Sequence, residues 1–187
     1  MKLLCFGDSN TYGYDPRAYF GSRYPAQHRW TDLLGKQLGC EIINEGENGR
    51  EIPHCTRDFL MFDRMLASQG PVDLLILLLG TNDLLQGNSV QTVAQRMASF
   101  LERVLPGTPG ILLIGPPILQ RGEWVPTQAL IDASAALNRE YSILSRRLGV
   151  GFADAGGWNI PLAFDGVHFT QEGHNAFAER LADYLKN

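Results

Sequence analysis

Short apolar runs alternate along the chain with longer segments whose apolar residues have helical spacing. The runs are continuous and bounded by Gly, Pro or polar turns, which is typical of strands buried on both faces of a parallel sheet. We predict strands at residues 2–6, 41–44, 72–79, 110–115 and 150–153. We predict helices at residues 26–38, 55–67, 89–105, 127–148 and 171–185.

This alternation predicts the overall architecture. Strands that alternate with helices form a parallel sheet with helices on both faces, so the fold class is α/β. The sequence contains no repeat, low-complexity segment or linker, and we expect a single domain over residues 1–187. In such sheets ligands bind beyond the carboxyl ends of the strands. Functional residues are therefore expected directly after the predicted strands.

Four short polar clusters fall at that edge of the predicted sheet. Three follow the first three apolar runs, and the fourth precedes the last amphipathic segment. Together they hold a serine, two kinds of N–H donor and a histidine with a carboxylate, which is the set of groups that acyl transfer through a serine requires. The clusters are Gly7-Asp8-Ser9-Asn10, Gly46-Glu47-Asn48-Gly49, Gly80-Thr81-Asn82-Asp83 and Asp165-Gly166-Val167-His168.

Ser9, His168 and Asp165 are the candidate nucleophile, base and orienting carboxylate. A serine hydroxyl is a poor nucleophile until a neighbour takes its proton, and an imidazole can do so near neutrality. Asp165 precedes His168 by three positions, so its carboxylate can hold the ring and stabilise the imidazolium. Singly, Ser9 is equally typical of a turn or helix cap, and His168 of a loop histidine. His174 is interpreted as a helix-face residue.

Asn82 and Gly49 are the candidate oxyanion donors. The Asn82 side-chain amide can donate to a developing oxyanion, although an asparagine in this place is also typical of an Asx turn. Gly49 can offer a backbone N–H, and without a Cβ it permits unusual dihedral angles and close approach of an acyl oxygen. Taken alone, Gly49 is also consistent with a plain turn. Asp83 is expected to brace its loop.

Composition and charge indicate which classes of partner and which cellular location to expect. Hydrophobic residues make up 44% of the 187 residues, the net charge is −4 and no block of like charges occurs, so we expect neither a nucleic-acid nor a membrane partner. The N-terminal apolar run is too short for a signal peptide, and the longest run, residues 74–79, cannot span a bilayer. Three cysteines without a CxxC indicate no disulfide framework or zinc site, and we expect a cytoplasmic protein.

The four clusters resemble the four blocks of the SGNH hydrolases, also called GDSL-type esterases and lipases. Gly7-Asp8-Ser9-Asn10 matches the first block, with Asn10 where many members have Leu. Gly80-Thr81-Asn82-Asp83 matches the third block, and Asp165 with His168 matches the last. The second-block glycine falls within residues 44–50, where Gly49 is preferred to Gly46 because it lies further past the strand end. The resemblance covers nearly the whole chain.

The resemblance implies a flavodoxin-like, three-layer α/β/α sandwich and ester hydrolysis without a metal or another cofactor. It implies an oxyanion hole made by Ser9 N–H, Gly49 N–H and the Asn82 side chain. The aromatic segment after the first block looks most like the arylesterase and acyltransferase branch, some members of which form oligomers. The expected partner is a small-molecule ester, and a homo-oligomer is compatible with this branch. The expected substrate contacts are Asp8, Asn10, Tyr12, Trp124 and Val167.

Two segments without predicted regular structure flank the expected site, and a third, residues 156–164, adjoins the last block. Residues 11–25 either pack their aromatic side chains on a helix or form a wall of the substrate site. Residues 118–126, with Trp124, are expected to form a second wall or an oligomer contact. The aromatic residues of the first segment are Tyr12, Tyr14, Tyr19, Phe20 and Tyr24.

Three alternatives to a simple esterase remain open. A sugar-ester deacetylase or a thioesterase would use the same groups. A metal-dependent hydrolase would draw on carboxylates and imidazoles, although no dense ligand spacing supports it. A non-catalytic binding module can share the scaffold but does not need the complete set of groups. The residues available to a metal site are Asp8, Asp83, Asp165, His168 and His174.

Overall fold

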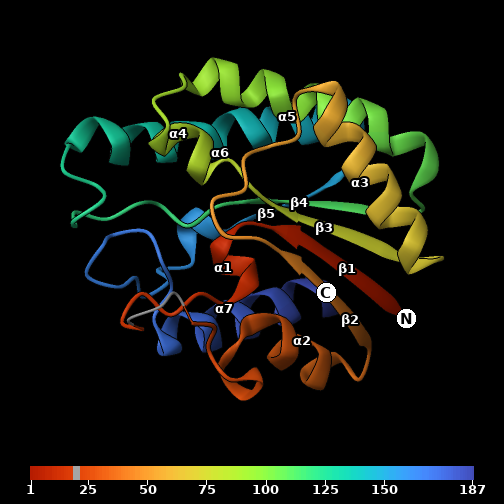
Figure 1. Ribbon diagram of the computed structural model, residues 1–187, viewed down its shortest axis with the longest axis horizontal. Coiled ribbons are helices and arrows are strands. Elements are labelled where there is room, and N and C mark those ends of the chain that lie inside the picture. Colours follow the sequence, from red (N-terminus) through yellow and green to blue (C-terminus); the bar gives the residue numbers. More distant parts are fainter. Residues whose placement is uncertain (19–21) are drawn as a thin grey trace.

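The computed structural model describes residues 1–18 and 22–187, and its core is a five-stranded parallel sheet of order β2-β1-β3-β4-β5 (Figure 1). All five predicted strands are present, with small shifts at their ends. The strand order is that of flavodoxin-like, doubly wound sheets, so the predicted α/β/α class is confirmed. The strands are β1 (Lys2–Gly7), β2 (Glu41–Gly46), β3 (Leu74–Leu78), β4 (Ile111–Gly115) and β5 (Gly151–Asp154).

The predicted helices are also present, but the first is divided. A 3-10 turn at Ala26–His28 is separated from α2 by Arg29, whose backbone is extended. The short helices α1 and α4 lie where the sequence predicts only turns, because so few residues cannot display a helical period. The helices are α1 (Ser9–Tyr12), α2 (Trp30–Leu38), α3 (Thr56–Gln69), α4 (Thr81–Leu85), α5 (Val90–Val104), α6 (Gln128–Leu148) and α7 (Gln171–Lys186), with further 3-10 turns at Leu105–Gly107 and Ala155–Gly157.

Alternate residues of each strand pack against two different layers of helices. Leu4 and Leu77 belong to the cluster that includes the apolar residues of α3, α5 and α6. Leu3 and Ile76 belong to the cluster on the opposite face, with the apolar residues of α2 and α7. Figure 1 shows the first group of helices above the sheet and the second below it. Because successive strand residues point to opposite faces, a sheet covered on both sides requires the continuous apolar runs of this sequence.

Helix α7 begins as the sequence predicts but buries a histidine. Thr170 caps it by accepting a hydrogen bond from Gly173 N–H at 3.0 Å. His174, in the first turns, is fully buried, and its Nδ1 accepts from the Trp30 N–H at 3.4 Å. Burial lowers the pKa of His174 to about 3, so the ring is neutral and belongs to the core.

The three cysteines are free: Cys5 is buried in β1, Cys40 is partly buried and Cys55 is exposed. In the part of the chain that the structure describes, no helix is both long and apolar enough to cross a membrane.

Strand β1 lies between β2 and β3, and the register aligns the ends of all three. Gly7 at the end of β1 pairs with Gly46 of β2 and with Leu78 of β3. Helix α1 follows β1 and packs directly over the end of β2, where the Asn44 side-chain amide donates to Thr11 O at 2.7 Å. A Cβ at Gly46 would lie 2.1 Å from Tyr12 N, so this close approach requires glycine.

We expect Gly46→Ala to destabilise the protein by about 2–3 kcal/mol, because the added methyl group must push α1 away from β2. Gly39→Ala is the matched control: Gly39 has φ +61°, but a Cβ there meets nothing within 4 Å. The control should lose about 1 kcal/mol from backbone strain alone. Urea unfolding measures both, and equal midpoints for the two variants would contradict the close packing of α1.

Candidate active site

Ser9 lies directly after β1, at the first residue of α1. Asp8 caps this helix by accepting a hydrogen bond from Asn10 N–H at 2.9 Å. The helix ends at Gly13, whose φ of +90° lets the chain reverse. Ser9 is only 5% exposed. The turn therefore holds the Ser9 side chain at the carboxyl edge of the sheet, where the strand prediction places it.

His168 connects Ser9 to Asp165. Its Nε2 lies 3.0 Å from Ser9 Oγ, and its Nδ1 lies 2.7 Å from Asp165 Oδ2. The other carboxylate oxygen, Asp165 Oδ1, accepts from the backbone N–H groups of Val167 and His168, both at 2.9 Å. Because Nδ1 faces a carboxylate it carries the proton, which leaves Nε2 able to accept the proton of the Ser9 hydroxyl. The structure thus brings Ser9 together with Asp165 and His168, which lie more than 150 positions further along the chain.

Two carboxylates near His168 have opposite pKa shifts. Burial acts to raise the pKa of Asp165, but hydrogen bonds from the His168 ring and from two backbone N–H groups outweigh it and lower that pKa below its usual value. Burial raises the pKa of Asp8 to about 6, against the opposing effects of the Asn10 N–H, His168 and Arg50. Asp165 is therefore ionised at neutral pH and can hold an imidazolium.

Asn82 lies beside the Gly49 loop. It is in the first turn of α4, directly after β3, and its Nδ2 donates to Arg50 O at 3.0 Å. The Asn82 amide has a second N–H to offer a ligand. Gly49, next to Arg50, is exposed with φ +75°, and a Cβ there would meet nothing within 4 Å. Its glycine is therefore favoured by the backbone conformation and not by close packing, unlike Gly46.

Arg50 and Asp83 hold this loop against the strand ends. The Arg50 guanidinium donates to Gly7 O at 2.9 Å and to Glu45 O, and lies 4.2 Å from the centre of the Phe6 ring. The sequence contains no signal for this role of Arg50, because a cation in a polar loop is usually a solvated side chain. Asp83 is expected to brace its own loop, but it lies in α4 and its side chain braces the neighbouring Gly49 loop: it accepts from Ile52 N–H at 3.0 Å and pairs with Arg96 at 2.7 Å.

Two aromatic rings lie against the His168 imidazole. The ring centres of Tyr14 and Trp124 are 4.6 Å and 5.0 Å from it, and Trp124 meets it edge-on at 78°. Trp124 is 49% exposed, so much of its ring is accessible. The loop of residues 165–169, which contains His168, is called the histidine loop. Residues 118–126 are joined to it, since Trp124 N–H donates to Asp165 O at 3.0 Å. This segment therefore lies beside His168, and its role as a second wall of the substrate site stays a prediction.

The segment of residues 11–25 divides between core and site. Tyr24 is buried in the core, whereas Tyr14 faces the imidazole. Tyr12, an expected substrate contact, is partly buried in α1, and the Arg23 guanidinium lies 4.6 Å from its ring centre. The first two residues of the segment, Thr11 and Tyr12, are helical, although the sequence predicts no regular structure in residues 11–25. Tyr19 and Phe20 lie outside the described residues.

Asn10, Asp8 and Val167, the remaining expected substrate contacts, are buried. Val167 packs with Leu119 in a small apolar cluster. Asn10 Nδ2 donates to Val167 O at 3.1 Å, and its Oδ1 accepts from Phe169 N–H at 2.9 Å. Asp8 caps α1. The two partners of the Asn10 side chain lie more than 150 positions away in sequence, so no local pattern of residues indicates them.

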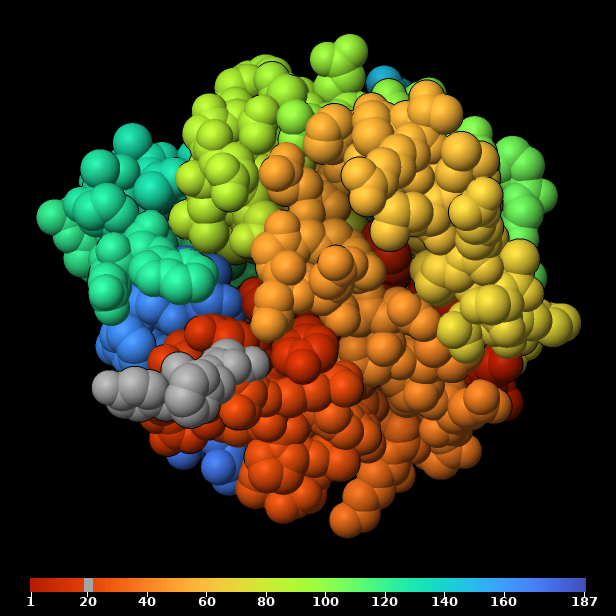
Figure 2. Space-filling view, in the orientation of Figure 1, coloured from red at the N-terminus to blue at the C-terminus, as the bar shows by residue number. Residues whose placement is uncertain are grey.

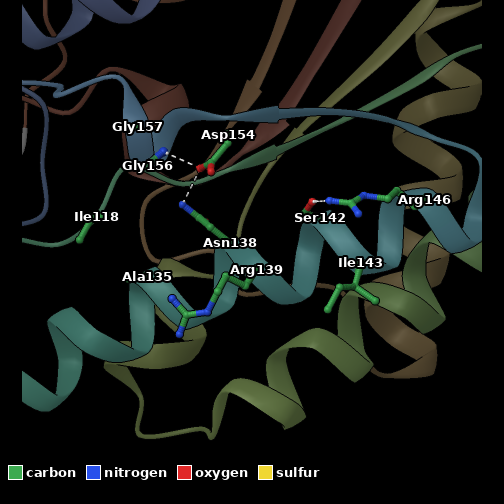
Figure 3. Close-up of a pocket in the computed structure, with 10 residues that line it drawn as sticks. All are labelled: Ile118, Ala135, Asn138, Arg139, Ser142, Ile143, Arg146, Asp154, Gly156 and Gly157. Atoms are coloured by element: carbon green, nitrogen blue, oxygen red, sulfur yellow. Dashed lines mark hydrogen bonds between the residues drawn. The ribbon is translucent and has the colours of Figure 1, made fainter.

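A cavity of about 620 Å³ lies between α3 and the loop of residues 47–54, which contains Gly49. Figure 2 shows the hollow between the orange loop and the yellow helix, with dark red atoms of β1 at its floor. Gly49, Phe6 and Met61 are among its lining residues, but Ser9 and His168 are not. A second cavity of about 520 Å³, lined by α6 and residues after β5, also excludes them (Figure 3).

The residues available to a metal site are not gathered together. Among the described residues, no group of three or more His, Cys, Asp or Glu side chains is placed to hold a metal ion. Asp83 pairs with Arg96, and His174 is buried against Trp30. His168 instead binds Asp165 through Nδ1 and Ser9 through Nε2. The arrangement can remove a proton from a serine and stabilise the resulting imidazolium.

Comparison with known proteins identifies the family. The model of the GDSL-like lipase/acylhydrolase family matches residues 5–176, and the chain belongs to this family of ester hydrolases. The inhibitor-bound aryl esterase of M. smegmatis is similar, with a TM-score of 0.88 and 29% identity over 99% of this chain and 98% of that one. Est24, a carbohydrate acetylesterase from Sinorhizobium meliloti, has a TM-score of 0.84 and 29% identity over 99% and 98%. No curated protein sequence is matched.

The raised pKa of Asp8, about 6, predicts a pH-dependent stability. The folded state holds the proton more tightly than the unfolded state, so ionisation of Asp8 destabilises the fold as the pH rises through about 6, by on the order of 3 kcal/mol at neutral pH. Asp8→Asn keeps an acceptor for Asn10 N–H but cannot ionise. Its melting temperature relative to wild type should rise by several degrees between about pH 4 and pH 7.5.

Asp15→Asn is the control for this measurement. Burial acts to raise the pKa of Asp15, but its interactions with Arg17 outweigh that and lower it. Its ionised form therefore stabilises the fold above the unfolded pKa, and the variant should show no gain towards pH 7.5. Calorimetry at both pH values decides the matter, and a pH-independent difference for Asp8→Asn would contradict the assignment.

Proposed function

We propose that this ester hydrolase is a serine esterase that cleaves small aryl or short-chain acyl esters through an acyl-enzyme on Ser9. The observation that carries the proposal is the buried line of hydrogen bonds from Ser9 Oγ to His168 Nε2 at 3.0 Å and from His168 Nδ1 to Asp165 at 2.7 Å. In this proposal Ser9 is the nucleophile, His168 the general base and Asp165 the group that orients the ring.

Acylation begins when Ser9 Oγ attacks the ester carbonyl carbon. The hydroxyl proton passes to His168 Nε2, and the carbonyl π electrons move to the oxygen. The oxyanion is stabilised by Ser9 N–H, Gly49 N–H and the Asn82 side chain. Support for this set comes from the contact of Asn82 with Arg50, which lies next to Gly49. When the tetrahedral intermediate collapses, the C–O bond breaks and His168 gives its proton to the leaving alcohol.

Deacylation repeats these steps with water. A water molecule gives its proton to His168 Nε2 and attacks the acyl carbon, and the intermediate then expels Ser9 Oγ, which recovers the proton. The products are a carboxylic acid and the free enzyme. An alcohol in the place of water would give acyl transfer. In both half-reactions the ionised Asp165 stabilises the imidazolium, consistent with its lowered pKa.

The aromatic rings beside His168 favour an aryl leaving group. The alcohol departs next to Nε2, and the Tyr14 and Trp124 rings lie within 4.6 Å and 5.0 Å of the imidazole centre. Flat apolar groups pack well on such rings. The similarity to an aryl esterase supports this substrate class, and the similarity to a carbohydrate acetylesterase supports acetylated sugars as a second candidate. The cytoplasmic location and a homo-oligomeric state stay predictions.

Hydrolysis of p-nitrophenyl acetate, butyrate and octanoate tests the mechanism. We expect Ser9→Ala to abolish turnover and Asn82→Ala to lower kcat roughly 10²–10³-fold, because the latter removes one oxyanion donor. Asn88→Ala is a control: its side chain donates to Asp83 O at 2.9 Å, in the same region, and should leave kcat nearly unchanged. Full turnover in Asn82→Ala would contradict the oxyanion assignment.

The same assay separates the alternative mechanisms. Chelator-resistant activity that also disappears with a serine-directed phosphonate supports the acyl-enzyme. Activity that survives Ser9→Ala, or is absent from folded wild-type protein, would reject the serine mechanism. A parallel panel of acetylated sugars and thioesters identifies the acyl donor, and the trend from acetate to octanoate measures the space for the acyl chain.

Trp124→Ala should reduce kcat/KM for p-nitrophenyl acetate roughly tenfold, mainly through KM, because the aryl group loses a packing surface. The effect on an acetylated sugar should be smaller. Tyr184→Ala is the control, since Tyr184 is a half-exposed aromatic residue on α7 that hydrogen-bonds to Phe152 O. Steady-state kinetics with both esters measure the difference, and an equal loss for both would refute the aryl contact.

A further inference from the structure

We propose that Asn10 is a positioning residue that holds His168 at the correct distance from Ser9, an inference that rests on the proposed serine mechanism. Its side chain bridges the two residues on either side of the base. Asn10 Nδ2 donates to Val167 O at 3.1 Å, and Asn10 Oδ1 accepts from Phe169 N–H at 2.9 Å. Both bonds span more than 150 sequence positions and are buried.

The backbone of Asn10 is itself held by two hydrogen bonds and by its place in α1. Asn10 N–H donates to Asp8 Oδ1 at 2.9 Å, and Asn10 O accepts from the Trp30 indole N–H at 2.9 Å. Asn10 also follows Ser9 directly in α1, so both share one rigid turn. With its backbone held in this way, the amide of Asn10 transmits the position of the nucleophile turn to the histidine loop.

The histidine loop receives few other connections to that turn. Among the described residues, its hydrogen bonds to α1 are the Ser9–His168 bond and the two bonds of the Asn10 side chain. The hydrogen bonds that Asp165 Oδ1 accepts from the Val167 and His168 N–H groups lie within the loop and move with it. Asn10 therefore sets the separation of base and nucleophile, on which proton transfer depends steeply.

The bridge requires a side chain that both donates and accepts a hydrogen bond. One partner is a carbonyl and the other an N–H, so the side chain must donate at one atom and accept at the other. Leucine has a similar branched shape but offers neither group. An ionised carboxylate can accept from Phe169 N–H but sets a second oxygen against Val167 O. A protonated carboxyl group can do both.

The test measures kcat and KM for p-nitrophenyl acetate in wild type, Asn10→Leu and Asn10→Asp. We expect Asn10→Leu to lower kcat on the order of 10²-fold with little change in KM, because a displaced base affects the transition state more than substrate binding. The activity of Asn10→Asp relative to wild type should rise as the pH is lowered, because protonation restores the donor to Val167 O. Ionisation of this buried carboxyl also destabilises the fold, so the ratio is compared only at pH values where circular dichroism shows the variant to be folded.

Asn138→Leu is the matched control. Asn138 is 5% exposed, close to the 6% of Asn10, and it also binds a backbone carbonyl, Pro116 O, at 2.8 Å. It lies in α6 beside Asp154, as Figure 3 shows, and makes no hydrogen bond to Ser9, Asp165 or His168 in the described structure. This variant should lose stability but keep kcat.

The serine mechanism and the positioning role of Asn10 are tested by different outcomes. Absence of Ser9-dependent hydrolysis in wild type rejects the proposed function. With wild type active, the positioning role is overturned if folded Asn10→Leu keeps kcat within about twofold, or if Asn138→Leu loses as much kcat. If Asn10→Leu does not fold, Asn10→Asp decides: an activity ratio that is flat or falls on acidification overturns the proposal, and a rising ratio supports it.

Discussion

The site depends on the register of three neighbouring parallel strands. Gly7 of β1 is paired with Gly46 of β2 and Leu78 of β3, so these strands end at one level of the sheet. Because parallel strands all run in one direction, the loops that follow them emerge at the same edge. Ser9, Gly49 and Asn82 each lie within a few residues of one of these strand ends, and the Arg50 guanidinium and carbonyl connect all three loops.

The histidine loop is placed by a different means. It precedes α7 and reaches the turn that holds Ser9 through side chains: the imidazole meets Ser9, and the Asn10 amide binds the backbone on both sides of His168. Burying this loop would be unfavourable without partners for its polar groups. Asp165 supplies them locally, and its hydrogen bonds keep it ionised despite burial. The interactions that order the loop also hold its imidazole within hydrogen-bonding distance of Ser9.

The long regular elements could be predicted from the sequence, because an apolar run or a helical period is repeated over enough residues to be recognised. The helices α1 and α4 could not, since each is shorter than two helical turns. Site residues with a chemical signature were also recognisable: Ser9, His168, Asp165 and Asn82 stand in short polar clusters after or before such elements. Arg50, Tyr14 and His174 carry no such signature, because their roles come from neighbours distant in sequence.

The order of apolar and polar segments thus determined the α/β class, the edge of the sheet at which the polar clusters lie and the residue types found there, because each of these follows from local periodicity and from chain direction. Only the tertiary structure decided how those residues meet. It turned Asn10 and Val167 inward, placed the Tyr14 and Trp124 rings against His168, and closed Gly46 under α1 while leaving Gly49 exposed. The physical reason is that hydrogen bonds and packing contacts between distant segments are sensitive to changes in distance of a few tenths of an ångström. No local pattern of residues encodes distances between segments so precisely.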